Sequence, residues 1–213
     1  MVATQTYAMR ESKAKKSILR VAKEMFSRVG YANLNVNEIA HEAGVSIGTL
    51  YYHFPKGKTS ILMQIRRQIA DKYVKKFEER LAPERLQETA SLDEGLELLL
   101  ETLIEIHREE RLVLAAMESE VLSNLAEYDR VAESVAVEEM MRSDAEPVTG
   151  VLGTLLERHP EEGLSLDGNE ARVNKVIDVL VHRFVYSEAT FGSEQEFIDM
   201  MINIVRTLLE EHS

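Results

Sequence analysis

The sequence predicts an all-α protein of about nine helices, and three observations favour this class. Apolar residues recur at intervals of three and four through most of the chain, which is the spacing of one face of a helix. No segment shows the strand-length alternation of apolar and polar residues that a half-buried β-strand requires. Residues that favour helix ends, among them Gly30, Asn35 and Ser91, stand at the edges of the periodic segments.

Three helices are expected in the first sixty residues. The first runs from Ser12 to Gly30, a natural helix terminator. The second begins near Val36, because Asn35 is a favoured N-cap residue and Glu38 can complete a capping box. The third helix follows a tight turn.

The turn makes residues 36–53 a candidate helix-turn-helix. Ala40 is small enough for two helices to cross closely, and Gly44 can adopt the left-handed backbone that the reversal needs. Such a unit places its second helix in the major groove of DNA. An ordinary helical hairpin has the same spacing and is the alternative.

The rest of the chain predicts a long helix followed by several shorter ones. The long helix runs from Lys56 to about Leu81, and Pro83 marks a break. Pro147 is expected to kink or break the helical run around it. The further helices are expected at 91–110, 111–124, 126–141, 148–159, 169–191 and 193–212.

Charge is distributed unevenly along the chain, although the formal net charge is −12. Residues 1–80 contain 15 Lys and Arg against 7 Asp and Glu, a net of +8, whereas residues 81–213 have a net of −20. Only the first part has the charge to face a polyanion, and the acidic part would be turned away from it. The alternative is that the acidic residues only keep the second part soluble.

The composition excludes several classes of protein. The chain has no Cys, so disulfides, thiol nucleophiles and thiolate metal sites are excluded. It has no apolar run of membrane-spanning length and no signal peptide, so we expect a cytoplasmic protein with no membrane partner. Nucleophile elbow, P-loop and Rossmann motifs are absent, which indicates a protein that is not an enzyme.

Residues 39–58, IAHEAGVSIGTLYYHFPKGK, resemble the DNA-binding domain of TetR/AcrR-family transcriptional regulators. The resemblance covers about the first sixty residues, and two positions depart from it: Asn35 stands where the family often has threonine, and Ile47 where it is often polar. It implies a three-helix helix-turn-helix DNA-binding domain at 10–57. A helical ligand-binding and dimerisation domain would follow at 58–213.

The resemblance also implies which residues contact an operator. Phosphate contacts fix the register of a protein on DNA, whereas contacts to base edges give sequence discrimination. Residues expected to grip phosphates are Tyr52, His53, Lys56 and Lys58, and those expected to read bases are Asn37, Ser46, Ile47, Gly48, Thr49 and Tyr51. Tyr52 could instead fill the core of the small domain.

An apolar cavity for a small hydrophobic effector is expected in the second domain, because bulky and flexible apolar side chains occur there beside a few polar ones. The candidate lining residues are Leu99, Leu103, His107, Met117, Val121, Met140, Met141, Leu155, His182 and Tyr186. Close packing of these side chains without a cavity is the alternative. The histidines show no HExxH motif or paired spacing, so we predict no metal site and no cofactor.

The last two helices have broad apolar faces that need burial. In the family that the chain resembles, the equivalent helices of two subunits form a four-helix bundle, which implies a homodimer. The candidate interface residues are Val176, Val179, Leu180, Arg183, Phe184, Phe197, Met200, Met201, Ile204, Val205 and Leu208.

The expected function is that of a sequence-specific transcriptional regulator. We expect a homodimeric repressor that a small hydrophobic ligand releases from a palindromic operator. One alternative is a ligand-independent DNA-binding or architectural protein, and another is a ligand-binding module with a degenerate DNA domain.

Overall fold

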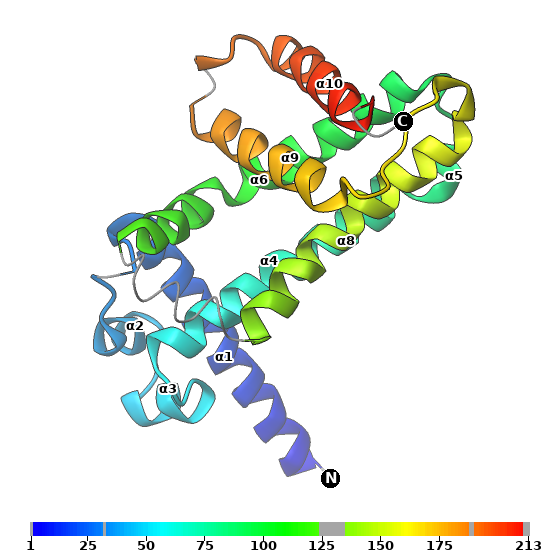
Figure 1. Cartoon of the computed structure of the whole chain (residues 1–213). Helices are drawn as coiled ribbons and strands as arrows, with labels where there is room; N and C mark the ends of the chain where they lie inside the picture. Colours follow the sequence, from blue (N-terminus) through cyan, green and yellow to red (C-terminus); the bar gives the residue numbers. More distant parts are fainter. Residues whose placement is uncertain (1, 32, 124–134, 188–189, 211–213) are drawn as a thin grey trace. The chain divides into compact units, whose positions relative to one another are not determined.

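The computed structural model describes residues 2–31, 33–123, 135–187 and 190–210, with side chains placed at 13–31, 33–115, 147–187 and 190–210. These residues form nine α-helices and one 3₁₀-helix and contain no strand (Figure 1). The elements are α1 (Val2–Val29), α2 (Val36–Glu42), α3 (Ile47–His53), α4 (Lys58–Arg80), α5 (Pro83–Leu86), α6 (Leu92–Ser123), α8 (Val135–Arg158), η1 (Pro160–Glu162), α9 (Glu170–Tyr186) and α10 (Glu194–Glu210). The predicted all-α class of about nine helices is confirmed for this part of the chain.

Three helices are longer than the sequence predicts. Helix α1 begins at Val2 instead of Ser12. Helix α6 runs unbroken over 92–123, where the sequence predicts two helices, because its charged middle contains neither glycine nor proline. Helix α8 continues through Pro147, which removes one backbone hydrogen bond at a cost of about 3 kcal/mol. Burial of Val148, Leu152 and Leu155 directly after the proline offsets that cost.

Capping hydrogen bonds define several helix ends. Asn35 Oδ1 accepts a hydrogen bond from the amide of Asn37 at 2.9 Å, which confirms Asn35 as the N-cap of α2. Before α10, the Ser193 amide donates to Glu196 Oε2 at 2.7 Å and the Glu196 amide donates to Ser193 Oγ at 3.3 Å. This reciprocal pair is the predicted capping box.

The chain divides into two compact units, and the division falls within α4 and within α6. Unit 1 comprises Met1–Asp71 and Leu112–Leu125, and unit 2 comprises Lys72–Arg111 and Ala126–Ser213. The sequence predicts a boundary between a DNA-binding domain and a ligand-binding domain at residues 57 and 58, and this boundary stays a prediction.

The core of unit 1 holds α1, α2 and α3 together. Phe26 from α1, Ile39 from α2, Leu50 from α3 and Phe54 directly after α3 are fully buried in one cluster. Ser17 Oγ donates to the carbonyl of Ala43 at 3.0 Å, which ties α1 to the turn between α2 and α3. That turn contains Gly44 at φ +68°, as its predicted left-handed role requires.

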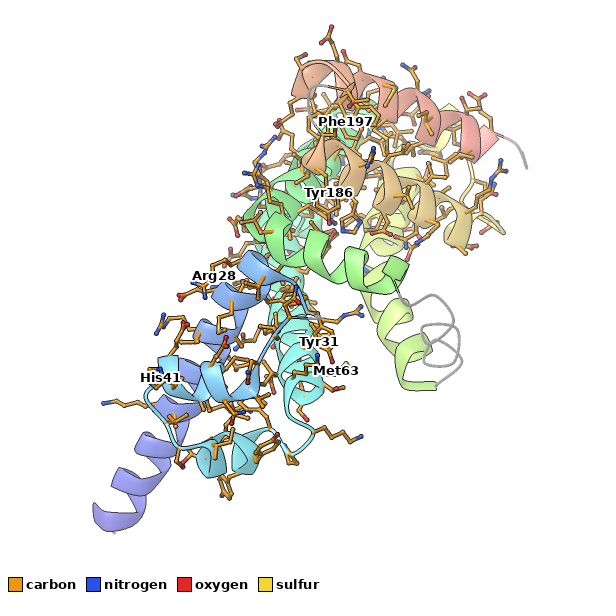
Figure 2. All side chains as sticks on the ribbon, turned by 90° about the vertical axis from the view of Figure 1, so that its left-hand side faces the viewer. Arg28, Tyr31, His41, Met63, Tyr186 and Phe197 are labelled. Carbon is orange, nitrogen blue, oxygen red and sulfur yellow. The ribbon has the colours of Figure 1, made fainter. Side chains whose placement is uncertain are left out.

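Unit 2 has a separate apolar core. The rings of Phe184 on α9 and Phe197 before the middle of α10 stack with centroids 4.2 Å apart, and Figure 2 labels Phe197 among the side chains of this unit. On α6, a Cβ atom at Gly95 would clash with the side chain of Leu155 on α8. Helices α6 and α8 therefore pack in direct contact at this point. Among the described residues, no helix has both the length and the apolar character needed to cross a bilayer.

Candidate functional site

Helix α3 buries one side and exposes the other. Leu50 points into the core and is fully buried. Ile47 is 40% exposed and Tyr52 is 63% exposed, and Tyr51 is exposed as well. Of the residues predicted to contact DNA, Asn37, Ser46, Gly48 and Lys56 are also exposed, and Thr49, His53 and Lys58 are half-buried. The predicted DNA-contacting residues of α3 thus lie on its accessible side.

Ser46 and Thr49 form the N-terminal cap of α3. Ser46 Oγ accepts a hydrogen bond from the Thr49 amide at 3.0 Å, and the two hydroxyl oxygens lie 2.8 Å apart. The cap satisfies an amide that would otherwise lack a partner within the helix. Sequence reasoning assigned both residues to base reading and missed this structural role, although serine before a helix is a common capping signal.

Gly48 has no packing reason to be glycine. Its φ is not positive, and an added Cβ would meet only Ser46 Oγ, at 3.8 Å, which is ordinary contact. Glycine inside a helix costs about 1 kcal/mol relative to alanine. The bare backbone at this exposed position leaves room for a close approach by another molecule.

The start of α4 is anchored to the loop before α2. The Lys58 ammonium lies 4.7 Å from the centroid of the Tyr31 ring and 3.5 Å from the Tyr31 carbonyl oxygen. The Tyr31 hydroxyl lies 3.2 Å from Thr59 Oγ1, and Figure 2 shows Tyr31 beside α4. Sequence reasoning missed Tyr31, which holds Lys58 in place. Lys56, in contrast, is exposed.

The turn between α3 and α4 depends on Gly57. It has φ +56°, and an added Cβ would come within 3.4 Å of the Tyr51 ring and 3.6 Å of Val36. The exposed Tyr51 therefore has the edge of its ring packed against the backbone of the turn, which restricts its orientation.

The predicted effector-lining residues separate into three groups. Leu99, Leu103 and Leu155 are fully buried and belong to the core of unit 2. His107, His182 and Tyr186 come together in the same unit. The side chains of Met117, Val121, Met140 and Met141 lie outside the described residues.

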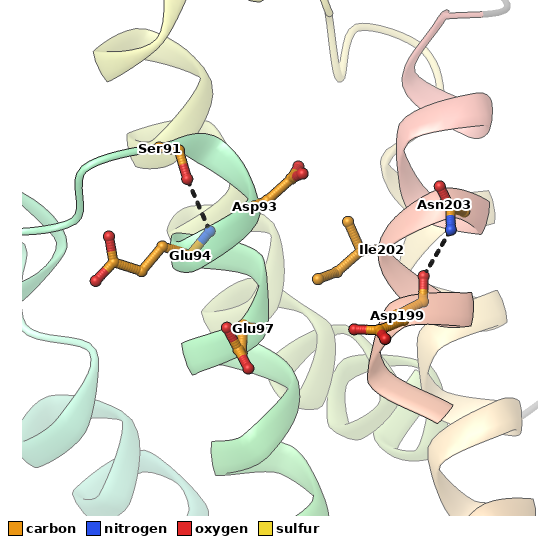
Figure 3. A pocket seen from close by; sticks show the side chains of 7 residues that line it. All are labelled: Ser91, Asp93, Glu94, Glu97, Asp199, Ile202 and Asn203. Carbon is orange, nitrogen blue, oxygen red and sulfur yellow. Dashed lines mark hydrogen bonds between the residues drawn. The ribbon is translucent and has the colours of Figure 1, made fainter. Parts of the chain in front are cut away.

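A polar pocket of about 400 Å³ lies between α6 and α10 of unit 2. Figure 3 shows Ser91, Asp93, Glu94 and Glu97 on one side and Asp199, Ile202 and Asn203 on the other. None of these residues belongs to the predicted effector-lining set. The carboxylates make this pocket unsuited to an apolar ligand.

His107 and His182 lie edge to face, with ring centroids 4.3 Å apart. Burial, together with the neighbouring His182, lowers the pKa of His107 to about 4, so its imidazole is neutral at pH 7. His182 Nδ1 lies 3.1 Å from Asp178 Oδ1. Although burial raises the pKa of Asp178, its hydrogen bond with His182 brings that pKa below the usual value. Sequence reasoning placed His107 and His182 together in the effector-lining set but missed Asp178, which lies on the same helix as His182.

The predicted dimer-interface residues are partly used within the chain itself. Phe184, Phe197, Met201, Val205 and Leu208 are buried in the core of unit 2. Val179, Arg183 and Met200 are exposed, and Val176, Leu180 and Ile204 are half-buried. Helices α9 and α10 therefore expose only some of the predicted interface residues to a partner.

Comparison with known proteins supports the assignment of the N-terminal residues. Residues 18–65 match the model described as "Bacterial regulatory proteins, tetR family". The HTH-type transcriptional regulator RutR of Escherichia coli (strain K12) is 37% identical over 93 residues, which are 42% of this chain and 41% of RutR. LmrA of Bacillus subtilis (strain 168), also an HTH-type transcriptional regulator, is 36% identical over 66 residues, which are 27% of this chain and 35% of LmrA. The matches thus span less than half the length of these relatives.

Solved structures resemble the whole fold. Salmonella enterica GusR has a TM-score of 0.66 at 19% identity, covering 92% of this chain and 95% of GusR. A TetR family transcription regulator from Marinobacter aquaeolei VT8 has a TM-score of 0.65 at 17% identity, covering 95% of this chain and 98% of that protein. At this level of identity the likeness concerns the fold alone.

Proposed function

The chain belongs to the tetR family of bacterial regulatory proteins, and from this premise we propose that it is a cytoplasmic, homodimeric transcriptional repressor that a small-molecule effector releases from a palindromic operator. Its named relatives RutR and LmrA are transcriptional regulators and not enzymes. The observation that carries the proposal is the exposed side of α3.

The base-reading part of the proposal rests on four exposed positions. Asn37, Ile47, Gly48 and Tyr51 are accessible on α2 and α3. Ile47 offers an apolar side chain that can contact a thymine methyl group, and Gly48 allows the helix backbone to approach the groove closely. The Ser46–Thr49 cap satisfies the Thr49 amide and fixes where α3 begins. The role of these two hydroxyls is therefore to set the helix end as well as to contact DNA.

The phosphate-gripping part rests on Tyr52, His53, Lys56 and Lys58. Lys56 is exposed at the end of the turn after α3, and Lys58 is held against Tyr31. A fixed ammonium loses less conformational freedom when it meets a phosphate. The net positive charge of residues 1–80 supports the same orientation toward DNA.

The dimer part of the proposal rests on one apolar face. Val176, Val179, Leu180 and Arg183 recur at helical spacing on α9, and Met200 and Ile204 lie one turn apart on α10. Two copies of this face would bury it. A two-fold dimer presents two recognition helices, which read half-sites about 34–36 Å apart on straight DNA.

The effector part rests on the His107, His182 and Tyr186 group within a largely apolar unit. Coupling between effector and operator is typically about 1–3 kcal/mol, and it is reciprocal. Operator DNA must therefore weaken effector binding by the same factor by which the effector weakens DNA binding.

The test is selection of bound duplexes from a random library with the full-length protein, followed by footprinting. We expect enrichment of an inverted repeat bound by two protein chains. Failure to enrich any inverted repeat would reject the proposal. If the protein binds a specific operator, but no compound that raises its melting temperature changes its operator affinity, effector control is rejected and DNA binding stands.

A further inference from the structure

Three potential metal ligands lie together in unit 2. His107 comes from α6, and Asp178 and His182 lie one turn apart on α9. One ligand atom from each side chain, a ring nitrogen or a carboxylate oxygen, lies within 4.8 Å of the other two. This is the one such group of three among the residues that the structure describes.

His107 is oriented as a metal-binding histidine is. Its Nδ1 lies 2.7 Å from the carbonyl oxygen of Leu103, and since a carbonyl only accepts, Nδ1 carries the proton. The lone pair is therefore on Nε2. Histidines that bind metals nearly always donate their other ring N–H to a carbonyl or carboxylate in this way. The His107 residue is 4% exposed, so few other partners can reach its Nε2.

His182 and Asp178 complete the donor set from a more accessible side. Their side chains are 27% and 40% exposed, so an ion can reach them from solvent. The ring of Tyr186 stacks on His182 with centroids 5.9 Å apart, and the ring of Tyr73 meets His107 edge-on at 5.5 Å. These aromatic rings limit the directions in which the two imidazoles can turn.

From this geometry we infer that His107, Asp178 and His182 bind a divalent transition-metal ion of the zinc type. Two imidazole nitrogens and a carboxylate oxygen suit Zn²⁺ and Co²⁺, and three protein ligands leave a fourth position for water. Ligands at about 2.0–2.1 Å from a tetrahedral ion lie about 3.4 Å apart. The ligand atoms lie within 4.8 Å of one another here, and inward rotation of the partly exposed Asp178 and His182 side chains would bring them to that shorter separation.

Lys175 competes with an ion for the carboxylate. Its ammonium lies 3.4 Å from Asp178 Oδ2, but its side chain is 67% exposed. Exposed ion pairs contribute little, so the lysine can swing away when an ion binds. Removing Lys175 should therefore strengthen metal binding. If Asp178 only formed this salt bridge and did not bind the ion, removing Lys175 would leave the metal affinity unchanged.

The inference concerns the ion site alone and does not depend on operator binding. The test uses full-length protein stripped with chelator, titrated with ZnCl₂ by calorimetry and with CoCl₂ by visible absorption. We expect one ion per chain and an absorption spectrum of low-symmetry, four-coordinate Co²⁺. The variants are Asp178→Asn, His182→Ala and Lys175→Ala, with His41→Ala, an exposed histidine of α2, as the matched control.

Asp178→Asn and His182→Ala should each weaken Zn²⁺ binding at least tenfold, and Lys175→Ala should strengthen it a few-fold. His41→Ala should bind as the unmodified protein does. Circular dichroism of each metal-free variant separates loss of the site from loss of the fold. Absence of saturable binding, or binding that persists in both folded Asp178→Asn and His182→Ala, would overturn the inference.

Discussion

Ser46 Oγ accepts the amide hydrogen bond of Thr49 at 3.0 Å and lies 2.8 Å from the Thr49 hydroxyl. The pair links the turn of the helix-turn-helix to the first turn of α3. Because α3 has only seven residues, it depends on the packing of its buried Leu50, and the N-terminal cap adds to that stability.

Replacing Ser46 by Ala should lower the free energy of unfolding by about 1 kcal/mol, because the Thr49 amide loses its acceptor. Ser46→Asp, which can accept the same hydrogen bond, should retain most of that stability. Urea unfolding of the three proteins measures the difference. Equal losses in the Ala and Asp variants would show that the cap is not the cause.

Gly44 and Gly48 should respond in opposite directions to substitution by Ala. At Gly44, with φ +68°, a side chain should cost about 1–2 kcal/mol although space is open around it. At Gly48 the same change should raise stability by up to about 1 kcal/mol. Thermal unfolding tests both expectations.

Gly48→Ala also tests the close approach of DNA to α3. If this position faces the groove, the added methyl group should lower operator affinity in a protein that is more stable than the parent. A fluorescence anisotropy titration with operator DNA measures the affinity. Unchanged affinity would place Gly48 outside the interface.

Lys56→Ala should weaken binding to operator and random DNA alike, because one phosphate contact is lost. The slope of log affinity against log salt concentration should fall in magnitude by about 0.9. Lys75→Ala, which removes an exposed lysine in unit 2, is the matched control and should leave the slope unchanged. A loss confined to the operator would instead assign Lys56 to base reading.

Val179→Asp should convert the proposed dimer to a monomer, because Val179 is 48% exposed on the apolar face of α9 and a carboxylate there would be buried without a partner. Val74 on α4 is also exposed, at 44%, and Val74→Asp is the control. Analytical ultracentrifugation gives the mass of each variant. If both variants remain dimers, the dimer interface does not include Val179.

Glu105 should contribute to stability in a pH-dependent way. The hydrogen bond from Lys76, aided by Arg80, holds the pKa of the Glu105 carboxyl below its usual value. A lowered pKa stabilises the folded state above the ordinary carboxyl pKa, and the stabilisation disappears as the pH falls through the lowered value.

The difference in unfolding free energy between the parent and Glu105→Gln should therefore be present at neutral pH and absent in strong acid. Because Glu105 is 45% exposed, solvent screening keeps the difference below about 1 kcal/mol. Glu157→Gln, a change at an exposed carboxylate of α8, serves as the comparison. Urea unfolding at the two pH values measures the effect, and a difference that grows in acid would contradict it.

Local signals predicted unit 1 well. Asn35 and Gly44 act through their own backbone and nearest neighbours, so a single stretch of sequence contains all that is needed to interpret them. Of the kink or break predicted at Pro147, the break is wrong: α8 continues through the proline, because burial of the following apolar residues outweighs a local preference. Tertiary contacts decided that case.

The His107, Asp178 and His182 cluster shows why sites are harder to predict than helices. Asp178 and His182 share a helix face, and their four-residue spacing was visible in the sequence. His107 reaches them only because α6 and α9 pack in the same core. No spacing rule joins residues that far apart in the chain.

Gly95 sets a limit on how the sequence can drift over generations. An added Cβ at position 95 would clash with Leu155 Cδ2, so any larger residue requires the fully buried Leu155 side chain or α6 to shift, and glycine is favoured as long as Leu155 is retained. A smaller residue at position 155 would make room for a side chain at position 95. By contrast, Gly150 and Gly153 on α8 have open space around their Cβ positions. Selection from a mutant library should recover many residues at those two positions and almost none at position 95.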